Sequence, residues 1–420
     1  MTSTKSFGIT KKMVLEAYRH VRANQGAAGV DGQSLEMFEA NLSGNLYKLW
    51  NRLASGSYFP PAVKRVEIAK KDGGVRMLGV PTVTDRIAQV VVKTRIEATL
   101  DPLFHPNSYG YRPGKSMQEA LEVTRKRCWE YEWVAEFDVQ KAFDELEHDL
   151  LLKALRKHIK ERWALLYIER WLKAPVMTKG GEILPRDRGI SQGGPLSPVL
   201  LNLFMHYAFD RWMQRRYPHL SFVRFADDAL VHCQSESEAH EVLAEIEQRL
   251  KECGLRMHPT KSAVVCCKGS SRRGDYPRIE FTFLGFTFRP RSAKARSGKL
   301  FMSFLPAVSR DATKRMMREM RSWKLHWNTP LSLHALAERY NPILRGWLNY
   351  YGSFYRSAMR RVFDYFNQKL ALWARRKYQK LRGRKARSLY WVGRIAKRQP
   401  RLFVHWLVFG GPAARAMGAV

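Results

Sequence analysis

Residues 222–231 are Phe-Val-Arg-Phe-Ala-Asp-Asp-Ala-Leu-Val, two short and largely apolar runs that enclose the adjacent carboxylates Asp227 and Asp228. This pattern predicts two strands joined by a tight turn, with both acids at the tip of a hairpin. Two like charges held together repel each other unless a cation joins them, and carboxylate oxygens suit Mg²⁺. The stretch is therefore a candidate half of a phosphoryl-transfer site. An ordinary solvated turn, in which adjacent Asp residues are common, is the alternative.

A third carboxylate, Asp138, lies upstream at the end of a strand-like run within residues 134–143. Two metal ions about 3.5–4 Å apart can activate an attacking oxygen and stabilise a leaving one, and such a pair needs carboxylates from separate strands. The chain then takes on the spacing of an amphipathic helix over 149–159. Asp138 is therefore expected at a strand-to-helix junction, where the cap of a helix N-terminus is the alternative role.

Between these acids, residues 189–198 are Gly-Ile-Ser-Gln-Gly-Gly-Pro-Leu-Ser-Pro, a turn that leads into an apolar, helix-like stretch over 199–209. Such a turn lets the backbone approach a ligand closely, and Gln192 beside Gly193 can contact a nucleotide or template; a plain loop is the alternative. The Asp138 run, this turn and the Phe-Ala-Asp-Asp hairpin occur in an order that resembles the palm of a bacterial group II intron reverse transcriptase.

Further blocks extend this resemblance over nearly the whole chain. They are 24–32, similar to an extension ahead of the fingers; 70–82, similar to a fingers hairpin; 108–116; 255–261; 281–288, similar to a primer-gripping turn; and 345–351, similar to a signature of the thumb or maturase domain.

The family resemblance implies roles for individual residues. It implies that Asp138, Asp227 and Asp228 are catalytic and hold two Mg²⁺ ions. It implies nucleotide contacts by Lys70, Arg76, Phe143, Gln192, Gly193 and Lys261, although an ordinary basic hairpin is the alternative for the first two. It implies template or primer contacts by Arg112, Leu284, Gly285 and Phe286.

The charge of the chain points to a nucleic-acid partner independently of the resemblance. The sequence has 73 Lys and Arg against 38 Asp and Glu, a formal net charge of +35, and residues 289–420 alone have 30 basic and 4 acidic side chains. Binding of so basic a region to phosphates releases many counterions. We expect nucleic-acid contacts from the densest cations, Arg375, Arg376, Lys377, Arg382, Arg384 and Lys385, and base stacking on Trp373, Tyr378, Tyr390 and Trp391. A solvated helix face or a membrane-surface segment is the alternative, but no lipid-facing apolar stripe accompanies the charge.

The length of 420 residues and the 45% apolar content predict two or three domains. The resemblance implies an α+β right-hand polymerase, with fingers and palm over 1–288, a mainly helical thumb or maturase domain over 289–370, and a basic helical region over 371–420. No run of about 18 apolar residues occurs, and 1–12 lack the apolar core of a signal peptide, so we expect a cytoplasmic protein without a membrane partner. Five Cys residues without paired two-residue spacing indicate core thiols rather than a disulfide framework or a zinc site.

Proteins of this family often carry a C-terminal endonuclease rich in Cys and His. After Cys267 this sequence has only His326, His334 and His405, too scattered for a metal cluster. The expectation is that the endonuclease is lacking, and that any intron insertion proceeds without second-strand cleavage by the protein, for example by priming from a nascent DNA end.

Two positions depart from the common family pattern. Phe225 stands where most relatives have Tyr before Ala-Asp-Asp, and residues 136–143 replace a more usual Gly-Phe-Phe sequence. Phe143 retains the ring that should clash with the 2′-hydroxyl of an incoming nucleotide, which predicts deoxynucleotide use.

The implied activity is attack of a primer 3′-hydroxyl on the α-phosphate of a dNTP with RNA as template, together with a maturase role in splicing group II intron RNA and in retrohoming to a DNA target. One alternative is a domesticated relative in DNA repair or phage defence, which genomic context would distinguish. A second is a non-enzymatic RNA splicing factor on a decayed palm. A third is an RNA-dependent RNA polymerase, against which Phe143 and the Gln192-Gly193 turn argue.

Overall fold

The computed structural model describes residues 7–69, 75–269, 274–295 and 297–412. The chain divides into two compact units. The first comprises Met1–Ala120 and Trp133–Val264, and the second comprises Leu121–Glu132 and Val265–Val420. The domain limits inferred from the sequence, after 288 and after 370, differ from this division into compact bodies and stay predictions.

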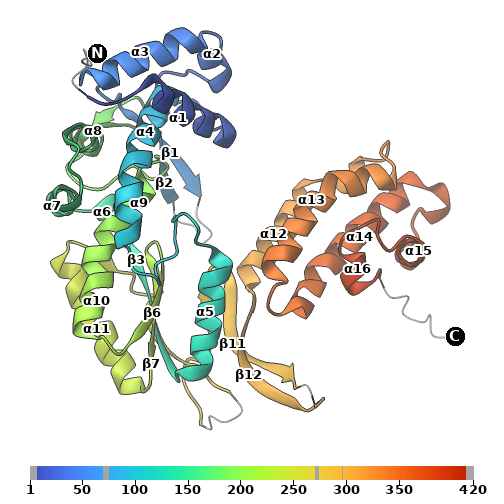
Figure 1. Ribbon diagram of the computed structural model, residues 1–420. Coiled ribbons are helices and arrows are strands. Elements are labelled where there is room, and N and C mark those ends of the chain that lie inside the picture. Colours follow the sequence, from blue (N-terminus) through green and yellow to red (C-terminus); the bar gives the residue numbers. More distant parts are fainter. Residues whose placement is uncertain (1–6, 70–74, 270–273, 296, 413–420) are drawn as a thin grey trace. The chain divides into compact units, whose positions relative to one another are not determined.

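A mainly antiparallel sheet forms the centre of the first unit (Figure 1). Its strands in spatial order are β6 (Ser221–Phe225), β7 (Asp228–Cys233), β3 (Trp133–Gln140) and β8 (Arg256–Met257). Most inner-strand side chains are apolar and buried, including Val134, Phe137 and Val231, each fully inaccessible. Strands buried on both faces are expected to be largely apolar rather than alternating, which explains the mostly apolar runs in this sequence. The hairpin predicted from 222–231 is confirmed, since β6 and β7 pair antiparallel around the two acids.

Helices cover the strands of this sheet and place the Gly-rich turn. The helices of this part are α6 (Ala142–Glu145), α7 (His148–His158), α8 (Arg162–Lys173), α9 (Ser197–Met205), α10 (Arg211–Arg216) and α11 (Glu236–Glu252). The helix predicted over 149–159 is confirmed by α7, in which Leu151, Leu152 and Leu155 are buried. The stretch predicted as a helix over 199–209 is helical, but from His206 onward it winds as a π-helix, η2 (His206–Asp210).

The N-terminal part of the first unit carries a second sheet and a helical layer. The strands, in the order β2-β1-β4-β5, are β1 (Val63–Ala69), β2 (Val75–Val80), β4 (Val176–Met177) and β5 (Ile183–Leu184), and the helical segments are α1 (Lys11–Asn24), α2 (Leu35–Glu39), α3 (Leu42–Ala54), α4 (Val83–Leu100) and η1 (Asp101–Leu103). Helix α4 is buried on most sides, and its buried Asp85 accepts hydrogen bonds from Tyr58, Gln89 and Trp171. Burial of that carboxyl raises its pKa, and the three donors satisfy it.

The second unit joins a three-stranded sheet to a group of helices. Its strands are β10 (Phe281–Phe283), β11 (Phe286–Lys294) and β12 (Leu300–Val308). Its helical segments are α12 (Arg310–Ser322), η3 (Leu325–Trp327), α13 (Leu333–Tyr351), η4 (Arg356–Met359), α14 (Arg360–Lys377), η5 (Gln379–Leu381), α15 (Lys385–Arg398) and α16 (Trp406–Phe409). Two further elements, α5 (Met117–Glu130) and β9 (Ala263–Cys266), have residues in both units. Aromatic rings fill the helical core, where Trp323 stacks on Tyr340 and Trp347 with centroids 4.5 and 5.6 Å apart.

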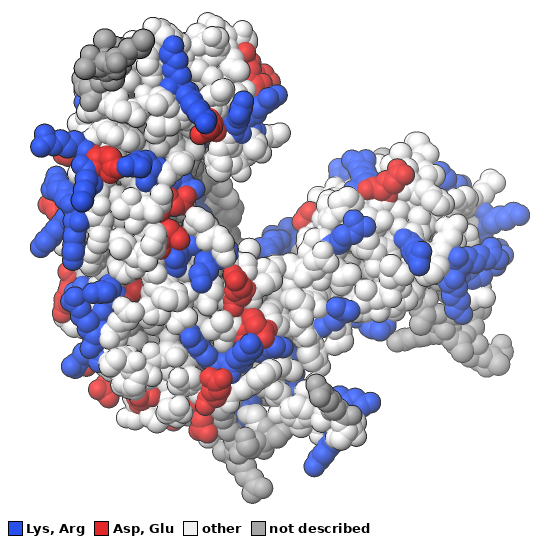
Figure 2. Space-filling view, viewed as in Figure 1, with Lys and Arg blue, Asp and Glu red and all other residues white. Residues whose placement is uncertain are grey.

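Positive side chains dominate the surface of the second unit. On the face that Figure 2 shows, the part of this unit where α15 lies in Figure 1 is rich in Lys and Arg, and acidic side chains are few. Across the residues that the structure describes, no helix is both long and apolar enough to cross a membrane. The cytoplasmic location stays a prediction.

Candidate active site

The sheet register brings the three predicted carboxylates together. Asp138 on β3 is the cross-strand partner of Asp228, the first residue of β7. Asp227 lies in the turn, and its carbonyl accepts a hydrogen bond of 3.3 Å from the backbone N–H of Val139. The turn is tight because Ala226 adopts a φ of +60°, a conformation that non-glycine residues rarely take. Asp138 therefore serves no helix cap, and the three acids share one end of the sheet.

Burial and mutual repulsion disfavour the charged forms of these acids. The pKa of Asp228 is raised well above its ordinary value, first by burial and then by Asp138, Asp227 and Glu136. The pKa of Asp227 is also raised by burial and by Asp138, whereas Arg76 and Lys261 oppose the shift. Positive charge offsets both the burial and the mutual repulsion of these carboxylates. The site therefore favours a bound cation.

Lys261 supplies one such cation from the chain itself. Its Nζ lies 3.0 Å from Asp138 Oδ2, in an arrangement that leaves the lysine side chain 55% exposed. Within the described ranges, no group of three or more His, Cys, Asp or Glu side chains is already arranged to hold a metal ion. The three aspartates nevertheless fit Mg²⁺ by the kind and charge of their oxygen donors. Lys261 occupies Oδ2 of Asp138, so a metal ion would either share this carboxylate with the ammonium group or displace it.

The fingers strand β2 meets the Gly-rich turn beside this site. Arg76 Nε donates to Gln192 Oε1 at 2.8 Å, and the backbone N–H of Gly79 donates to the Gln192 carbonyl at 2.7 Å. Gly193 has a φ of +117°, and a Cβ there would lie 2.6 Å from the Gly79 carbonyl oxygen. Glycine is thus required by both the backbone angle and the close approach. Arg76, Gln192 and Gly193 are brought together as one group, whereas Lys70 lies outside the described residues.

Phe143 is anchored at the edge of the same group. It lies in the short helix α6, only 7% exposed, and its carbonyl accepts a 2.6 Å hydrogen bond from the backbone N–H of Ile190. A Cβ on the preceding Gly189, whose φ is +74°, would lie 2.4 Å from the Asp144 carbonyl oxygen. Backbone contacts between α6 and the Gly-rich turn therefore hold Phe143 in place. Its contact with a sugar is proposed from this position beside the Gly-rich turn.

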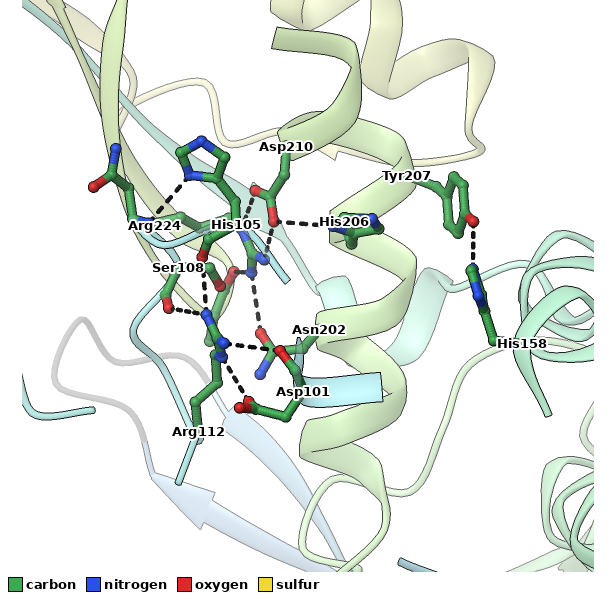
Figure 3. Close-up of polar contacts among 12 residues, drawn as sticks. Asp101, His105, Ser108, Arg112, His158, Asn202, His206, Tyr207, Asp210 and Arg224 are labelled. Carbon is green, nitrogen blue, oxygen red and sulfur yellow. Dashed lines mark hydrogen bonds and ion pairs between the residues drawn. The ribbon is translucent and has the colours of Figure 1, made fainter. Parts of the chain in front are cut away.

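Arg224, which the sequence interpretation passed over, holds the carboxylate turn from behind (Figure 3). Its side chain on β6 is fully buried. Nε and Nη2 each donate to one carboxylate oxygen of Asp210 at 2.7 Å, and Nη1 donates to Asn202 Oδ1 at 3.1 Å and to the Ala226 carbonyl at 2.8 Å. Its charge and its guanidinium donors are thus matched, as a buried ion pair requires. The signal in the sequence was an arginine inside an otherwise apolar strand.

The block 108–116 supports this turn from the other side. Asn202 Nδ2 donates to the Gly110 carbonyl at 2.7 Å, and a Cβ on Gly110 would lie 2.4 Å from the backbone nitrogen of Ala226. The backbone of Arg224 bonds to Asn107 and Tyr109 as in a neighbouring strand. This block therefore positions the hairpin tip.

Four predicted nucleic-acid contacts require correction, and the first two are Arg112 and Phe286. Arg112 has a side chain only 7% exposed, and its guanidinium donates to Asp101 and to the carbonyls of His105 and Ser108, so it braces its own loop rather than a template. Phe286 is fully buried against aromatic rings of the second unit, which removes its side chain from a primer.

The third correction is Lys377, whose Nζ donates to the carbonyls of Thr329 and Leu331 at 2.7 and 2.9 Å. Trp373 is fully buried, so it cannot stack on bases. The remaining basic side chains differ in exposure: Arg375 is half-buried, and the exposed ones are Arg376, Arg382, Arg384 and Lys385. Leu284 and Gly285 form the half-exposed turn between β10 and β11, and both have positive φ.

The fold and the site define a polymerase palm, in which paired strands present three acids beside a Gly-rich turn. The family model for reverse transcriptase (RNA-dependent DNA polymerase) matches residues 68–288, and the model for the group II intron, maturase-specific domain matches 313–391. The chain belongs to the reverse transcriptase family, and its relatives identify the group II intron reverse transcriptase/maturase branch.

Two curated relatives illustrate the match. Protein YkfC of Escherichia coli (strain K12) is 34% identical over 209 residues, which cover 48% of this chain and 54% of that protein. Group II intron-encoded protein LtrA of Lactococcus lactis subsp. cremoris is 29% identical over 269 residues, which cover 63% of this chain and 43% of that protein. The chain thus spans about half the length of the curated relatives it matches. Among solved structures, telomerase from Candida albicans aligns with a TM-score of 0.44 and 14% identity over 89% of this chain and 67% of that chain, too distant for an inference about function.

Proposed function

We propose that this chain is an RNA-directed DNA polymerase that adds deoxynucleotides to a primer 3′-hydroxyl. The observation that carries the proposal is the strand register that sets Asp138 opposite Asp228, with Asp227 adjacent. The match of residues 68–288 to the reverse transcriptase family supports it. A decayed palm would have no reason to keep a repulsive cluster of half-buried carboxylates, because such a cluster costs stability unless a cation binds it.

Asp138, Asp227 and Asp228 would hold two Mg²⁺ ions, which supply positive charge to the attacking hydroxyl and to the triphosphate. The chain adds cations of its own. Lys261, whose Nζ lies 3.0 Å from Asp138 Oδ2, is the first, and its proposed role is to turn to the triphosphate when that carboxylate binds an ion. Arg76, which Gln192 orients through a 2.8 Å hydrogen bond, is the second cation at this edge. Preorganised positive groups stabilise the charge that develops on transferring phosphates.

Sugar selection is assigned to Phe143. The side chain is only 7% exposed, and the backbone of Phe143 is bonded to the Gly-rich turn, so the ring has little room to move aside for a 2′-hydroxyl. The proposed substrates are therefore dNTPs, with an RNA template and a DNA primer.

A second activity, stabilisation of folded group II intron RNA for splicing, is proposed for the second unit. The match to the maturase-specific domain over 313–391 supports it. The exposed cations Arg376, Arg382, Arg384 and Lys385 have the character of a phosphate-binding surface. The proposed partners of the chain are intron RNA and, in retrohoming, a DNA target.

Primer extension tests the polymerase proposal directly. Purified protein is given an RNA template, a DNA primer, Mg²⁺ and either dNTPs or NTPs, beside Asp227→Asn and the control Asp149→Asn, whose carboxylate is exposed at the start of α7. DNA product from the unchanged protein and the control, but not from Asp227→Asn, supports the proposal, provided that all three bind RNA equally. RNA product from NTPs would indicate an RNA polymerase, and tight RNA binding without product would favour a splicing factor alone.

A further inference from the structure

A cavity of about 510 Å³ opens on the first unit and has no part in the site above. Four cations and two aromatic rings from α7, η2, α10 and α11 line it: Lys157, Arg211, Arg215, Arg249, Tyr207 and Trp212. None of the three aspartates proposed as metal ligands lines it. Its volume lies in the range of about 300–1,000 Å³ that is usual for sites of small ligands.

The positive charge of this cavity is not balanced by acidic groups. Among its lining residues, all of which lie in the described part of the chain, there is no Asp or Glu. Arg249 is paired with Glu252 at 3.1 Å. For Lys157, Arg211 and Arg215 no ion pair is found within the described ranges, and all three are exposed. Arg211 and Arg215 are four residues apart on α10, a spacing at which like charges repel each other. A bound anion would offset this repulsion.

Contacts with neighbouring side chains position the two aromatic rings that line this cavity. The hydroxyl of Tyr207 lies 2.5 Å from His158 Nε2, as Figure 3 shows, and Lys157 Nζ lies 5.4 Å from the centre of its ring. Trp212 packs edge-on against Tyr217 with centroids 5.8 Å apart. Rings held in this way form a platform for a planar base without losing much conformational freedom.

A neutral polar group completes the lining. His206 in the π-helix η2 is only 5% exposed, and its Nδ1 makes no hydrogen bond within the described part of the chain, although Asp210 Oδ2 lies 3.9 Å away. Burial lowers the pKa of His206 to about 4, so the ring is uncharged near neutral pH. A π-helical turn is rare and often occurs at functional sites, because it changes where side chains point.

We propose that this cavity holds one nucleotide of an RNA strand, its phosphate against Lys157, Arg211 and Arg215 and its base against Tyr207 and Trp212. Cations suit the phosphate, and aromatic faces are how proteins bind unstacked RNA bases. The choice of RNA as the source of the nucleotide rests on the proposed function. The cavity is thus a second RNA contact of the first unit, separate from the template and primer path of the carboxylate site.

Neighbouring arginines on α10 provide a matched test. Arg215→Gln removes a cavity cation, whereas Arg216→Gln removes the same charge from a side chain that pairs with Glu245 and does not line the cavity. The binding of a labelled 20-nucleotide single-stranded RNA is measured by fluorescence anisotropy at several KCl concentrations. Loss of one phosphate contact should weaken binding about fivefold at 0.1 M salt and reduce the salt slope by about 0.7. Arg216→Gln should change affinity less than twofold. Equal weakening by the two variants would overturn the proposal.

Cross-linking locates the base. RNA that contains 4-thiouridine is irradiated with the protein, and the modified peptides are mapped by mass spectrometry. Adducts on residues 207–212 that diminish in Arg211→Gln/Arg215→Gln support the proposal, and adducts confined to other segments refute it. If AMP competes for this cavity while RNA affinity is unchanged in the double variant, the ligand is a free nucleotide and the RNA assignment fails. Primer extension by the same samples is scored separately, so failure of the polymerase proposal is distinguishable from failure of this one.

Discussion

Replacement of Arg224 by Lys tests whether the buried guanidinium holds the carboxylate turn. The lysine keeps the positive charge beside Asp210, but one ammonium group cannot reproduce the four hydrogen bonds of 2.7–3.1 Å. Asn202 Oδ1 and the Ala226 carbonyl are then left without this donor. A buried acceptor without a partner costs about 1–3 kcal/mol, so the two together should lower the free energy of unfolding by about 2–6 kcal/mol.

The matched control is Arg216→Lys. Its guanidinium also bonds both carboxylate oxygens of one acid, Glu245, at 2.9 and 2.8 Å, but its side chain is 60% exposed. Exposed pairs of this kind contribute about 0–1 kcal/mol. The two variants therefore make the same chemical change in a buried and in an exposed pair.

Urea unfolding and primer extension measure the two consequences. Arg224→Lys should lower both stability and the rate of extension at saturating substrate, because Ala226 directly precedes Asp227 and Asp228. The double variant Arg224→Met/Asp210→Leu removes both buried charges, so it should recover more stability than activity. Equal loss of stability in Arg224→Lys and Arg216→Lys, or unchanged extension by Arg224→Lys, would refute the reasoning.

Three further outcomes are expected. Phe143→Ala should raise the ratio of ribonucleotide to deoxynucleotide incorporation about 10–200-fold in single-turnover extension, since removal of the ring admits the 2′-hydroxyl, and an unchanged ratio would contradict its role. His405 is buried, its Nε2–H donates to Asn367, and its pKa is lowered to about 3. The folded chain therefore binds fewer protons than the unfolded one between the unfolded pKa of about 6.5 and pH 3, and stability falls as the pH falls through this window. In His405→Phe the loss of unfolding free energy from pH 7 to pH 5 should be smaller by about 2 kcal/mol, and equal losses in the two proteins would count against this. Gly110→Ala should lower the melting temperature, because the added Cβ would meet the backbone nitrogen of Ala226. Gly346→Ala, inside α13, should stabilise the chain by about 0.5–1 kcal/mol, because the added Cβ would meet no atom of another part of the chain within 4 Å. Shifts of the same sign in the two variants would refute both expectations.

Local patterns in the sequence were sufficient for the hairpin that carries Asp227 and Asp228 and for helix α7. In both segments, the spacing of apolar residues along the sequence agrees with which side chains are buried in the folded chain. The long strands β11 and β12 were not expected, because residues 289–294 are rich in basic and small side chains and form a strand only through pairing with the segment that follows. Tertiary context thus overrode a weak local preference.

The sequence predicted the residues that carry the chemistry of the candidate site, but not the residues that hold them in place. Motif order located the acids, but only the folded chain shows that Arg224 binds Asp210 and Asn202, which precede it by 14 and 22 residues. Burial also separates residues that the sequence treats alike: Lys377 is bound to backbone carbonyls, whereas Arg382 is exposed. Spacing cannot reveal such differences, because they depend on packing between distant segments.

All five cysteines are buried thiols, two in the first unit and three in the second. A thiol-reactive reagent reaches a buried sulfur only when the surrounding structure opens. The kinetics of labelling at Cys233 and Cys253 therefore report opening of the first unit, and those at Cys128, Cys266 and Cys267 report opening of the second. The labelling rates of the native cysteines thus measure the opening of each unit separately. A change in either rate on addition of RNA or dNTPs would show which unit the ligand stabilises.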